Sequence, residues 1–353
     1  MSARKRILGA AAGAVGLAAA GAAVGVNRQS RAIGRRKVDE TPFGTLRSRP
    51  VTVIADDGVP LHVEIDELDP SLRQPASPIT LVFCHGYALN LDCWHFQRAA
   101  YRGLVRSVYY DQRSHGRSGR SREGNATIDQ LGQDLMSVLE AVVPDGPVVL
   151  VGHSMGGMTI VAFTEQQPAL IGERVVGVGL ISTTAGGLDP SRVLLPLIPA
   201  KLGGELASRT VRTLARGHRL IDGLRRAGHS LAMVGTDLFA FGDAVPAAYV
   251  DFVDEMLSAT PFEVVAEFFP SFKGLDKFDA VGTLGRIPTT IICGTVDRLT
   301  SIGHSRKLHE RIPGSVLLEC ENAGHMVLLE RHGQVNAALD QLLSAAAERV
   351  GSA

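Results

Sequence analysis

Short apolar runs rich in β-branched residues alternate with helical stretches along most of this chain, and this alternation is the feature that most constrains its fold. Strands that alternate with helices build a mostly parallel sheet with helices packed on its faces. Eight runs are predicted to be strands: Val51 to Ala55, Leu61 to Ile65, Ile79 to Cys84, Ser107 to Tyr110, Val148 to Val151, Val175 to Ile181, Thr289 to Cys293 and Val316 to Glu319. We therefore expect an α/β fold with an eight-stranded, mostly parallel sheet flanked by helices.

Two local signals refine this prediction. The turn sequence Asp56-Asp57-Gly58 separates the first two strands, which favours an antiparallel hairpin at the sheet edge. Thr127 and Gln130 have the spacing of a capping box, which predicts that a helix begins there.

The stretch from roughly Thr183 to Ile287 contains no strand pattern, and a structureless loop of that length is implausible in a compact domain. We predict a helical cap over residues 188–275, inserted after the sixth strand.

The first 40 residues differ from the rest of the chain. An uncharged run from Ile7 to Val26 has the length of a membrane span, although its Ala and Gly content makes its hydrophobicity marginal. Residues 1–40 are therefore predicted to be a membrane anchor or a signal segment, which would place the protein at a membrane or the cell envelope through residues 7–26. The basic residues after the run outnumber those before it and favour a cytoplasmic main domain, whereas the signal-like start favours export.

The segment from Val148 to Gly157 has the pattern of a nucleophile elbow. A buried strand runs into Gly152-His153-Ser154-Met155-Gly156, and a helix-compatible stretch follows. The sharp strand-to-helix turn presents the serine, and small residues are needed at 152 and 156 because the backbone passes too close for side chains. Ser154 is therefore predicted to be a nucleophile that attacks an acyl carbonyl.

A nucleophilic serine needs a base, and the base needs a third group that fixes its tautomer and stabilises its charge. Asp297 follows the predicted strand Thr289 to Cys293, and His325 follows the predicted strand Val316 to Glu319. Both positions lie after carboxyl ends of strands, where parallel sheets bind their ligands, and the chain order is Ser, Asp, His. We predict His325 as the base and Asp297 as the group that orients it. Simpler interpretations are a helix cap for Asp297 and a polar helix-start residue for His325.

The oxyanion formed during attack needs N–H donors that are already in place. The backbone of Met155, next to the nucleophile, is predicted to supply one donor. The loop Cys84-His85-Gly86-Tyr87 after the third strand is predicted to supply the other, through the backbone of Tyr87. We interpret His85 as a structural histidine that holds this loop.

Over about residues 50 to 347 the sequence resembles the capped α/β-hydrolase superfamily, in particular its serine esterases and lipases. The resemblance rests on His85-Gly86, on the run from Asp111 to Ser118, on the elbow, and on the positions of Asp297 and Gly324-His325. Ser114 stands where the family usually has glycine. The resemblance implies an α/β-hydrolase fold, with a catalytic domain formed by residues 50–187 and 276–347 around the cap, and structural roles for Asp111 and Arg113.

Several reactions occur on this fold, and the catalytic residues alone do not separate them. Epoxide hydrolases and dehalogenases of the superfamily use an aspartate at the elbow, so Ser154 excludes their chemistry. We favour hydrolysis of carboxylic esters, with a small-molecule or lipid ester as substrate, because the predicted cap is long and rich in Phe and Leu. The alternatives are a cofactor-free perhydrolase or haloperoxidase-like enzyme, a carbon–carbon bond hydrolase, or a catalytically silent binding protein.

Composition and missing motifs exclude other classes. The formal net charge is zero and no basic run is interleaved with aromatic residues, so we expect no nucleic-acid partner. The sequence contains no H-E-x-x-H motif and no carboxylate cluster at ligand spacing, and no G-x-G-x-x-G follows the first strand. We therefore expect neither a metal nor a cofactor.

Overall fold

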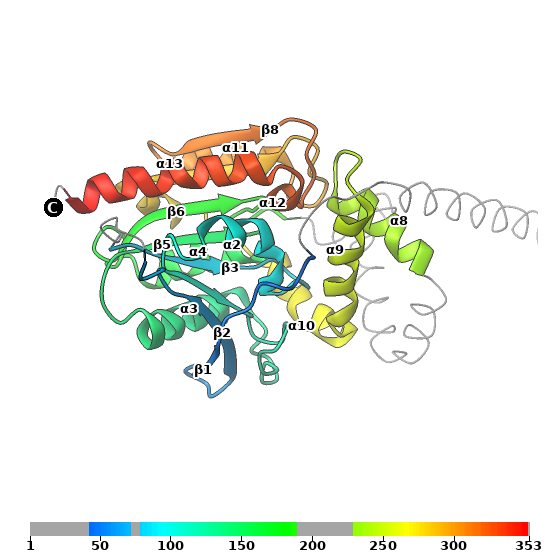
Figure 1. Ribbon diagram of the computed structural model, residues 1–353, viewed down its shortest axis with the longest axis horizontal. Coiled ribbons are helices and arrows are strands. Elements are labelled where there is room, and N and C mark those ends of the chain that lie inside the picture. Colours follow the sequence, from blue (N-terminus) through cyan, green and yellow to red (C-terminus); the bar gives the residue numbers. More distant parts are fainter. Residues whose placement is uncertain (1–41, 72–77, 189–228, 352–353) are drawn as a thin grey trace, which may run out of the picture.

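The computed structural model describes residues 42–71, 78–188 and 229–351, which form a sheet with helices packed on both faces (Figure 1). The sheet has eight strands in the order β1-β2-β4-β3-β5-β6-β7-β8. The strands are β1 (Pro50–Ile54), β2 (Pro60–Asp66), β3 (Thr80–Cys84), β4 (Ser107–Tyr110), β5 (Val148–His153), β6 (Val175–Ile181), β7 (Thr289–Gly294) and β8 (Val316–Cys320). β2 is antiparallel to both of its neighbours, and all other pairs are parallel. The predicted α/β fold is confirmed.

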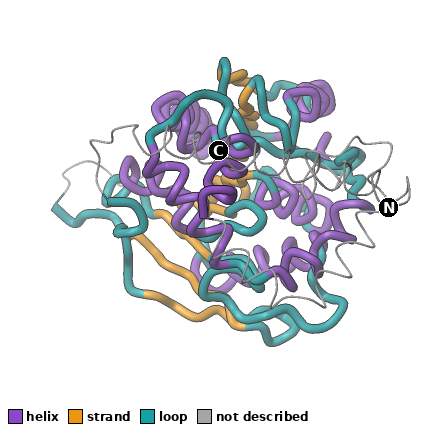
Figure 2. The backbone as a smooth tube through the Cα atoms, turned by 90° about the vertical axis from the view of Figure 1, so that its right-hand side faces the viewer, coloured by secondary structure: helices purple, strands orange, loops and turns teal. Residues whose placement is uncertain are grey.

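Successive side chains of each central strand point to opposite faces of the sheet, and each face has its own core. In β3, Leu81 and Phe83 belong to the core on one face, whereas Val82 and Cys84 belong to the core on the other. The first face is covered by α2 (His95–Tyr101) and α13 (His332–Gly351), and the second by α3 (Ile128–Val142), α4 (Met155–Gln166) and α11 (Ile302–Arg311). Seen from the side of the cap, helices lie on both sides of the strands in the middle of the molecule (Figure 2).

The predicted hairpin joins β1 to β2 at the sheet edge. The N–H of Gly58 donates to the carbonyl of Ala55 at 2.8 Å, and Gly58 has a φ of +85°, which glycine adopts without a steric cost. Helix α3 begins as predicted, because the Thr127 hydroxyl accepts from the N–H of Gln130 at 3.1 Å. The capping box is incomplete, however, since the Gln130 amide donates to Asp56 at 2.7 Å, in the hairpin turn, and not to the backbone of Thr127.

Helices follow β6 before the chain returns to the sheet, as predicted. The described part of this insertion contains α8 (His229–Ala240), α9 (Ala247–Ala259) and α10 (Phe262–Lys273), which lie beyond the strand ends to which the arrows of β3 and β6 point (Figure 1). A β-bridge between Gly186 and Asp276 pairs the chain that leaves the sheet with the chain that returns to it. The domain boundaries at 188 and 275 stay a prediction, and residues 189–228 lie outside the described residues.

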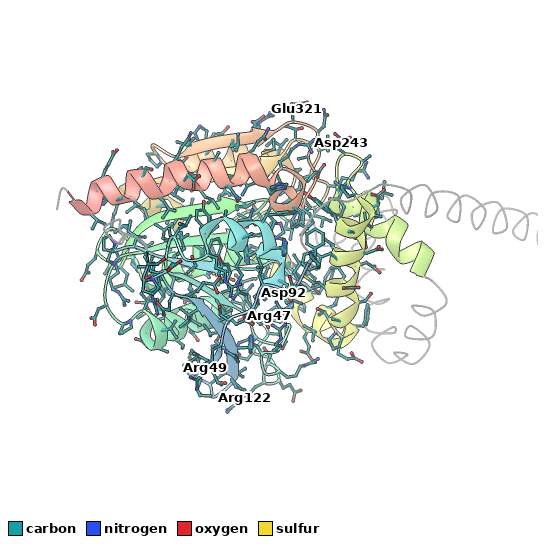
Figure 3. All side chains as sticks on the ribbon, viewed as in Figure 1. Arg47, Arg49, Asp92, Arg122, Asp243 and Glu321 are labelled. Carbon is teal, nitrogen blue, oxygen red and sulfur yellow. The ribbon has the colours of Figure 1, made fainter. Side chains whose placement is uncertain are left out.

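The segment before β1 contacts both the helical cap and the sheet domain. The ring of Phe43 stacks on Phe252 of α9 with centroids 4.6 Å apart. Arg47, four residues later, pairs with Asp92 through Nη1 and Nη2, and the Nη2 contact with Oδ2 measures 2.8 Å (Figure 3). Asp92 lies in the short helix η1 (Leu91–Trp94) after the β3 loop. The segment therefore braces the cap against the sheet domain.

The prediction of a transmembrane anchor, and of the membrane or cell-envelope location that rests on it, is corrected by the structure. No helix within residues 42–71, 78–188 and 229–351 combines the length and the apolar character needed to cross a membrane. The longest of them, α13, carries Asp340 and Glu348 among other polar residues, so only one of its faces is apolar. Residues 7–26, on which the prediction depended, lie outside the described residues.

Candidate active site

Ser154 lies at the corner between β5 and α4, with a backbone φ of +53° and ψ of −117°. A positive φ is uncommon for a residue with a side chain and persists only where the surrounding structure enforces it. Here β5 is buried along its whole length, and α4 begins at the next residue, Met155. The strained corner presents the serine side chain at the carboxyl edge of the sheet.

Close backbone packing explains why glycine flanks this corner. A Cβ on Gly152 would lie 2.4 Å from the carbonyl oxygen of Gly156, and a Cβ on Gly156 would lie 1.9 Å from that of Cys84. Neither position accepts a side chain without movement of the backbone. The absence of a side chain at Gly156 therefore lets the loop after β3 lie directly against the start of α4.

Asp297 and His325 form a buried pair after two neighbouring strands. The Nδ1 of His325 lies 2.9 Å from the Oδ2 of Asp297. The other Asp297 oxygen accepts from the backbone N–H of Leu299 and of Thr300, at 2.8 and 2.9 Å. Burial opposes ionisation of Asp297, but His325 and these hydrogen bonds outweigh it, so its pKa lies below the ordinary value. Asp297 is thus an ionised acceptor that holds the proton of His325 on Nδ1.

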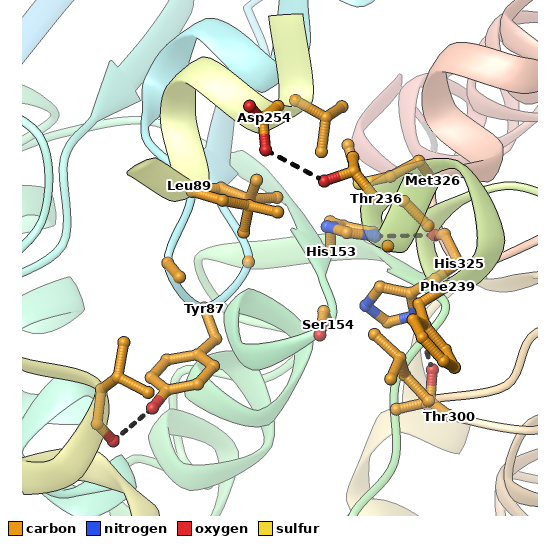
Figure 4. A pocket seen from close by; sticks show the side chains of 18 of the residues that line it. Tyr87, Leu89, His153, Ser154, Thr236, Phe239, Asp254, Thr300, His325 and Met326 are labelled. Carbon is orange, nitrogen blue, oxygen red and sulfur yellow. Dashed lines mark hydrogen bonds between the residues drawn. The ribbon is translucent and has the colours of Figure 1, made fainter. Parts of the chain in front are cut away.

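Sheet topology brings the three predicted side chains together. β7 precedes Asp297, β8 precedes His325, and these parallel strands are neighbours, so their carboxyl ends lie at one edge. Ser154 and His325 both line a cavity of about 440 Å³ beneath the cap. Figure 4 shows the imidazole of His325 facing Ser154, although no hydrogen bond joins these two side chains among the described residues. Such contacts are often long in unliganded enzymes and tighten with substrate.

The loop after β3 presents Tyr87 to the same cavity. The N–H of Gln112 donates to His85 Nε2 at 2.9 Å, so the His85 proton is on Nδ1, which donates to the carbonyl of Gly86 at 2.7 Å. The carbonyl and N–H of a trans peptide point in opposite directions, so this bond also fixes the direction of the Tyr87 N–H. Burial lowers the pKa of His85 to about 4 and keeps it neutral. These contacts support the interpretation of His85 as a structural histidine.

Two backbone N–H groups remain without acceptors near Ser154. In the described part of the chain, no hydrogen bond uses the N–H of Tyr87 or of Met155. Met155 is the first residue of α4, and the first N–H groups of a helix have no intrahelical partner. The predicted oxyanion donors are therefore available to a ligand.

A sequence profile described as the alpha/beta hydrolase family matches residues 81–338. The chain belongs to this family. An uncharacterized protein of Mycobacterium tuberculosis is 26% identical over 271 residues, which cover 72% of each chain. Epoxide hydrolase A of the same species is 26% identical over 309 residues, which cover 77% of this chain and 92% of the relative. Family membership supports hydrolase chemistry in general.

The fold of this alpha/beta hydrolase also has solved counterparts. A thermophilic esterase from Thermogutta terrifontis superposes with a TM-score of 0.65 at 20% identity, covering 85% of this chain and 99% of the esterase. At this level of identity the likeness shows the fold alone.

Three further residues of this hydrolase contact His325, its neighbour Gly324 or its partner Asp297. No sequence motif marks these three residues. His153 Nε2 lies 3.0 Å from the His325 carbonyl, and burial lowers the His153 pKa to about 3, so the neutral ring donates to that carbonyl. The Thr300 hydroxyl donates to Asp297 at 2.9 Å. Glu330 accepts from the N–H of Gly324 at 2.8 Å. His153 is the variable position of G-x-S-x-G, and Glu330 ends the otherwise apolar helix α12 (Val327–Glu330).

Asp111 and Arg113 belong to the supporting structure of the site. The Asp111 carboxylate is fully buried and accepts from the backbone N–H of Leu91 and of Arg117, both at 2.8 Å. Arg113 pairs with Asp134 at 2.6 Å on the other side of this loop. Ser114, which follows Arg113, has a φ of +65°, so it adopts the left-handed conformation that the glycine usual at this position would adopt without strain.

Proposed function

We propose that this protein is a serine hydrolase that cleaves carboxylic esters through an acyl-enzyme on Ser154. The observation that carries the proposal is the 2.9 Å contact between His325 Nδ1 and Asp297, with the imidazole facing Ser154 across the cavity (Figure 4). Asp297 holds the proton on Nδ1, which leaves Nε2 as the basic nitrogen on the side of the serine. This is the relationship that a nucleophilic serine requires.

The proposed reaction has two steps. Ser154 Oγ attacks the ester carbonyl while His325 takes the serine proton, and the oxyanion accepts hydrogen bonds from the N–H groups of Tyr87 and Met155. The bond to the alkoxy oxygen then breaks, and His325 gives its proton to the departing alcohol. A water molecule then attacks the acyl carbonyl while His325 takes its proton, the bond to Ser154 Oγ breaks, and His325 returns the proton to that oxygen as the carboxylic acid leaves.

Asp297 remains ionised in this cycle. Its carboxylate accepts two backbone N–H groups, the Thr300 hydroxyl and His325, so it is well placed to stabilise the imidazolium that forms during each step. The same contacts fix the orientation of the ring. Asp297 acts through His325 and does not itself exchange a proton with the substrate.

The cavity favours a lipophilic acyl group. Its lining is dominated by apolar side chains, including Met158, Phe239, Phe262 and Phe272. A pocket of this character binds an acyl chain mainly by excluding water from it. We propose that the cap over residues 188–275 selects the substrate, and that residues 50–187 and 276–347 form the catalytic domain.

Replacement of Ser154 tests the proposal directly. Ser154→Ala should reduce kcat on a short-chain aryl ester by about 10⁴ to 10⁶ and abolish labelling by a fluorophosphonate, and His325→Ala should cause a similar loss in kcat. Ser344→Ala, an exposed serine of α13, is the matched control and should leave both readouts unchanged. Retention of more than about a tenth of wild-type kcat by Ser154→Ala would exclude this mechanism.

A further inference from the structure

His153, the last residue of β5, touches two parts of the proposed catalytic machinery with one ring. Its Nε2 donates to the backbone carbonyl of His325 at 3.0 Å (Figure 4). Its Nδ1 is buried and has no hydrogen-bond partner among the residues that the structure describes. The whole side chain is buried, so this nitrogen does not face solvent. A buried polar atom without a partner calls for an explanation.

Gly86 lies directly against the Nδ1 edge of this ring. A Cβ on Gly86 would lie 2.8 Å from His153 Nδ1 and 3.3 Å from Cε1, so the approach leaves no room for a side chain. Gly86 precedes Tyr87, whose N–H is the proposed oxyanion donor. We call residues 85–88 the oxyanion loop. The ring of His153 therefore fills the space between the oxyanion loop and the backbone of His325.

The oxyanion loop does not hold its position by local preference alone. Ala88 has a φ of +57°, which is uncommon for a residue with a side chain. Such a conformation persists only where the surrounding structure enforces it. The ring of His153 contacts the loop two residues earlier and blocks movement of Gly86 toward His325.

A neutral ring suits this place, whereas a cation does not. His325 becomes an imidazolium during the proposed reaction, and the centroids of the two histidine rings lie 4.9 Å apart. A positive charge on His153 would oppose that imidazolium, and a proton on its Nδ1 would have no acceptor at Gly86. Burial lowers the pKa of His153 to about 3, which keeps the ring neutral while it donates from Nε2.

We propose that His153 is a positioning residue for the ester hydrolysis proposed above, on which this inference rests. Its ring sets the separation between the oxyanion loop and His325, so that the Tyr87 donor and the base keep matching positions around Ser154. Both groups act on one tetrahedral centre, because the base takes the serine proton while the oxyanion forms. A displacement of about 1 Å can cost about a hundredfold in rate. His153 itself exchanges no proton with the substrate.

Two amide substitutions test the hydrogen bond to His325. In His153→Gln the amide nitrogen reaches the place of Nε2 and can donate to the His325 carbonyl, whereas in His153→Asn it reaches only the place of Nδ1. His153→Asn should lower kcat on a short-chain aryl ester by about tenfold or more, with a smaller change in KM. His153→Gln should stay within about threefold of the wild-type kcat. Melting curves give an assay temperature at which both variants are folded.

A double-mutant cycle tests the contact with the oxyanion loop. Gly86→Ala places a methyl group against His153 Nδ1 and should lower kcat by about tenfold or more. The flexible amide of His153→Gln can move aside, so Gly86→Ala should cost at least about threefold less in that background. His309→Gln is the matched control, because His309 is exposed in α11 and does not line the cavity. It should leave both kcat and the cost of Gly86→Ala unchanged.

Each measurement has an outcome that contradicts the proposal. Equal kcat values for His153→Gln and His153→Asn, or a loss that appears in KM and not in kcat, would overturn the role of the hydrogen bond. A Gly86→Ala effect of the same size with and without the His153 ring would overturn the coupling to the oxyanion loop. Failure of the wild-type protein to hydrolyse the ester and to react with a fluorophosphonate would instead overturn the ester hydrolysis itself.

Discussion

Glu330 accepts a hydrogen bond from the N–H of Gly324 at 2.8 Å, and Gly324 immediately precedes His325. The same carboxylate accepts from the N–H of Asp243 at 2.8 Å and of Gly242 at 3.2 Å, in the turn between α8 and α9. Its side chain is fully buried. One carboxylate therefore holds the segment that carries the proposed base against the cap.

Glu330→Ala should lower both stability and kcat. The substitution removes the acceptor of three backbone N–H groups, and the N–H of Gly324, which is buried, is left unsatisfied at a cost of about 1–3 kcal/mol. The His325 segment should lose its fixed position, so kcat should fall more than KM rises. Thermal unfolding and steady-state kinetics at several pH values measure these effects. Glu330→Gln, which keeps one acceptor oxygen, should recover part of the kcat, and Glu348→Ala on the exposed face of α13 should behave as wild type.

Asp297→Asn should reduce kcat by up to roughly 10⁴-fold with little change in fold, because the amide favours the wrong tautomer of His325. Asp111→Asn is the comparison, since Asp111 binds backbone N–H groups of the supporting loop. It should lower the melting temperature more than it lowers kcat. The reverse pattern in kinetics and melting experiments would transfer the role of orienting acid to Asp111.

Gly156→Ala should destabilise the protein by about 1–3 kcal/mol or more, because the new methyl group would overlap the carbonyl of Cys84 and force the two backbones apart. Gly333→Ala is the control. Gly333 lies in α13 with open space around its Cα, so this change should stabilise the helix by about 0.5–1 kcal/mol. Denaturant unfolding measures both effects, and equal stability of the two variants would contradict the close approach at the elbow.

Acid should destabilise the fold because three buried histidines are held neutral in the folded protein. Burial lowers the pKa of His85 to about 4 and those of His115 and His153 to about 3, from an ordinary value of 6.5. Below pH 6.5 the unfolded chain therefore binds more protons than the folded one. The contribution of these histidines to the free energy of unfolding is therefore fully present above pH 6.5. It is lost as the pH drops toward 4, by about 1.4 kcal/mol per pH unit for each histidine.

Replacement of one of these histidines checks the assignment. His115 is fully buried, its Nδ1 contacts the Arg113 carbonyl at 2.9 Å, and its ring lies against the rings of His85 and Tyr87. His115→Asn should remove one proton from the uptake on unfolding between pH 6 and 5. The unfolding free energy should then fall less steeply in this range, by about 1.4 kcal/mol per pH unit. An unchanged slope would mean that His115 does not couple folding to protonation.

Local sequence patterns determined the strands and the elbow. The strand from Ser107 to Tyr110 and that from Val175 to Ile181 have the predicted bounds, and the other six differ by at most two residues at an end. An apolar run between turn residues leaves little choice of conformation, and Gly152 and Gly156 mark the corner at which Ser154 lies. These features depend on neighbours in the chain, which the sequence displays directly.

Local patterns predict poorly where one sequence signal is compatible with two structures. The capping-box spacing correctly predicted Thr127 as the N-cap, but the Gln130 side chain bonds to Asp56, a residue that only the folded hairpin brings near. The apolar run at residues 7–26 suggested a transmembrane helix, and the structure contributes no such helix within its described residues. Length and composition alone do not decide what surrounds a segment.

The tertiary structure decided the contacts between distant parts of the chain. Sequence order indicated that Asp297 and His325 follow strands, and the pairing of β7 with β8 makes them neighbours at 2.9 Å. Nothing in the sequence indicated that Glu330 would bind the turn after α8, or that Asp254 would enter the cavity beside Thr236. A sequence determines which residues lie at the ends of its elements, because that depends on local backbone preferences. Which side chains then meet depends on how the elements pack, because packing joins residues that no local pattern relates.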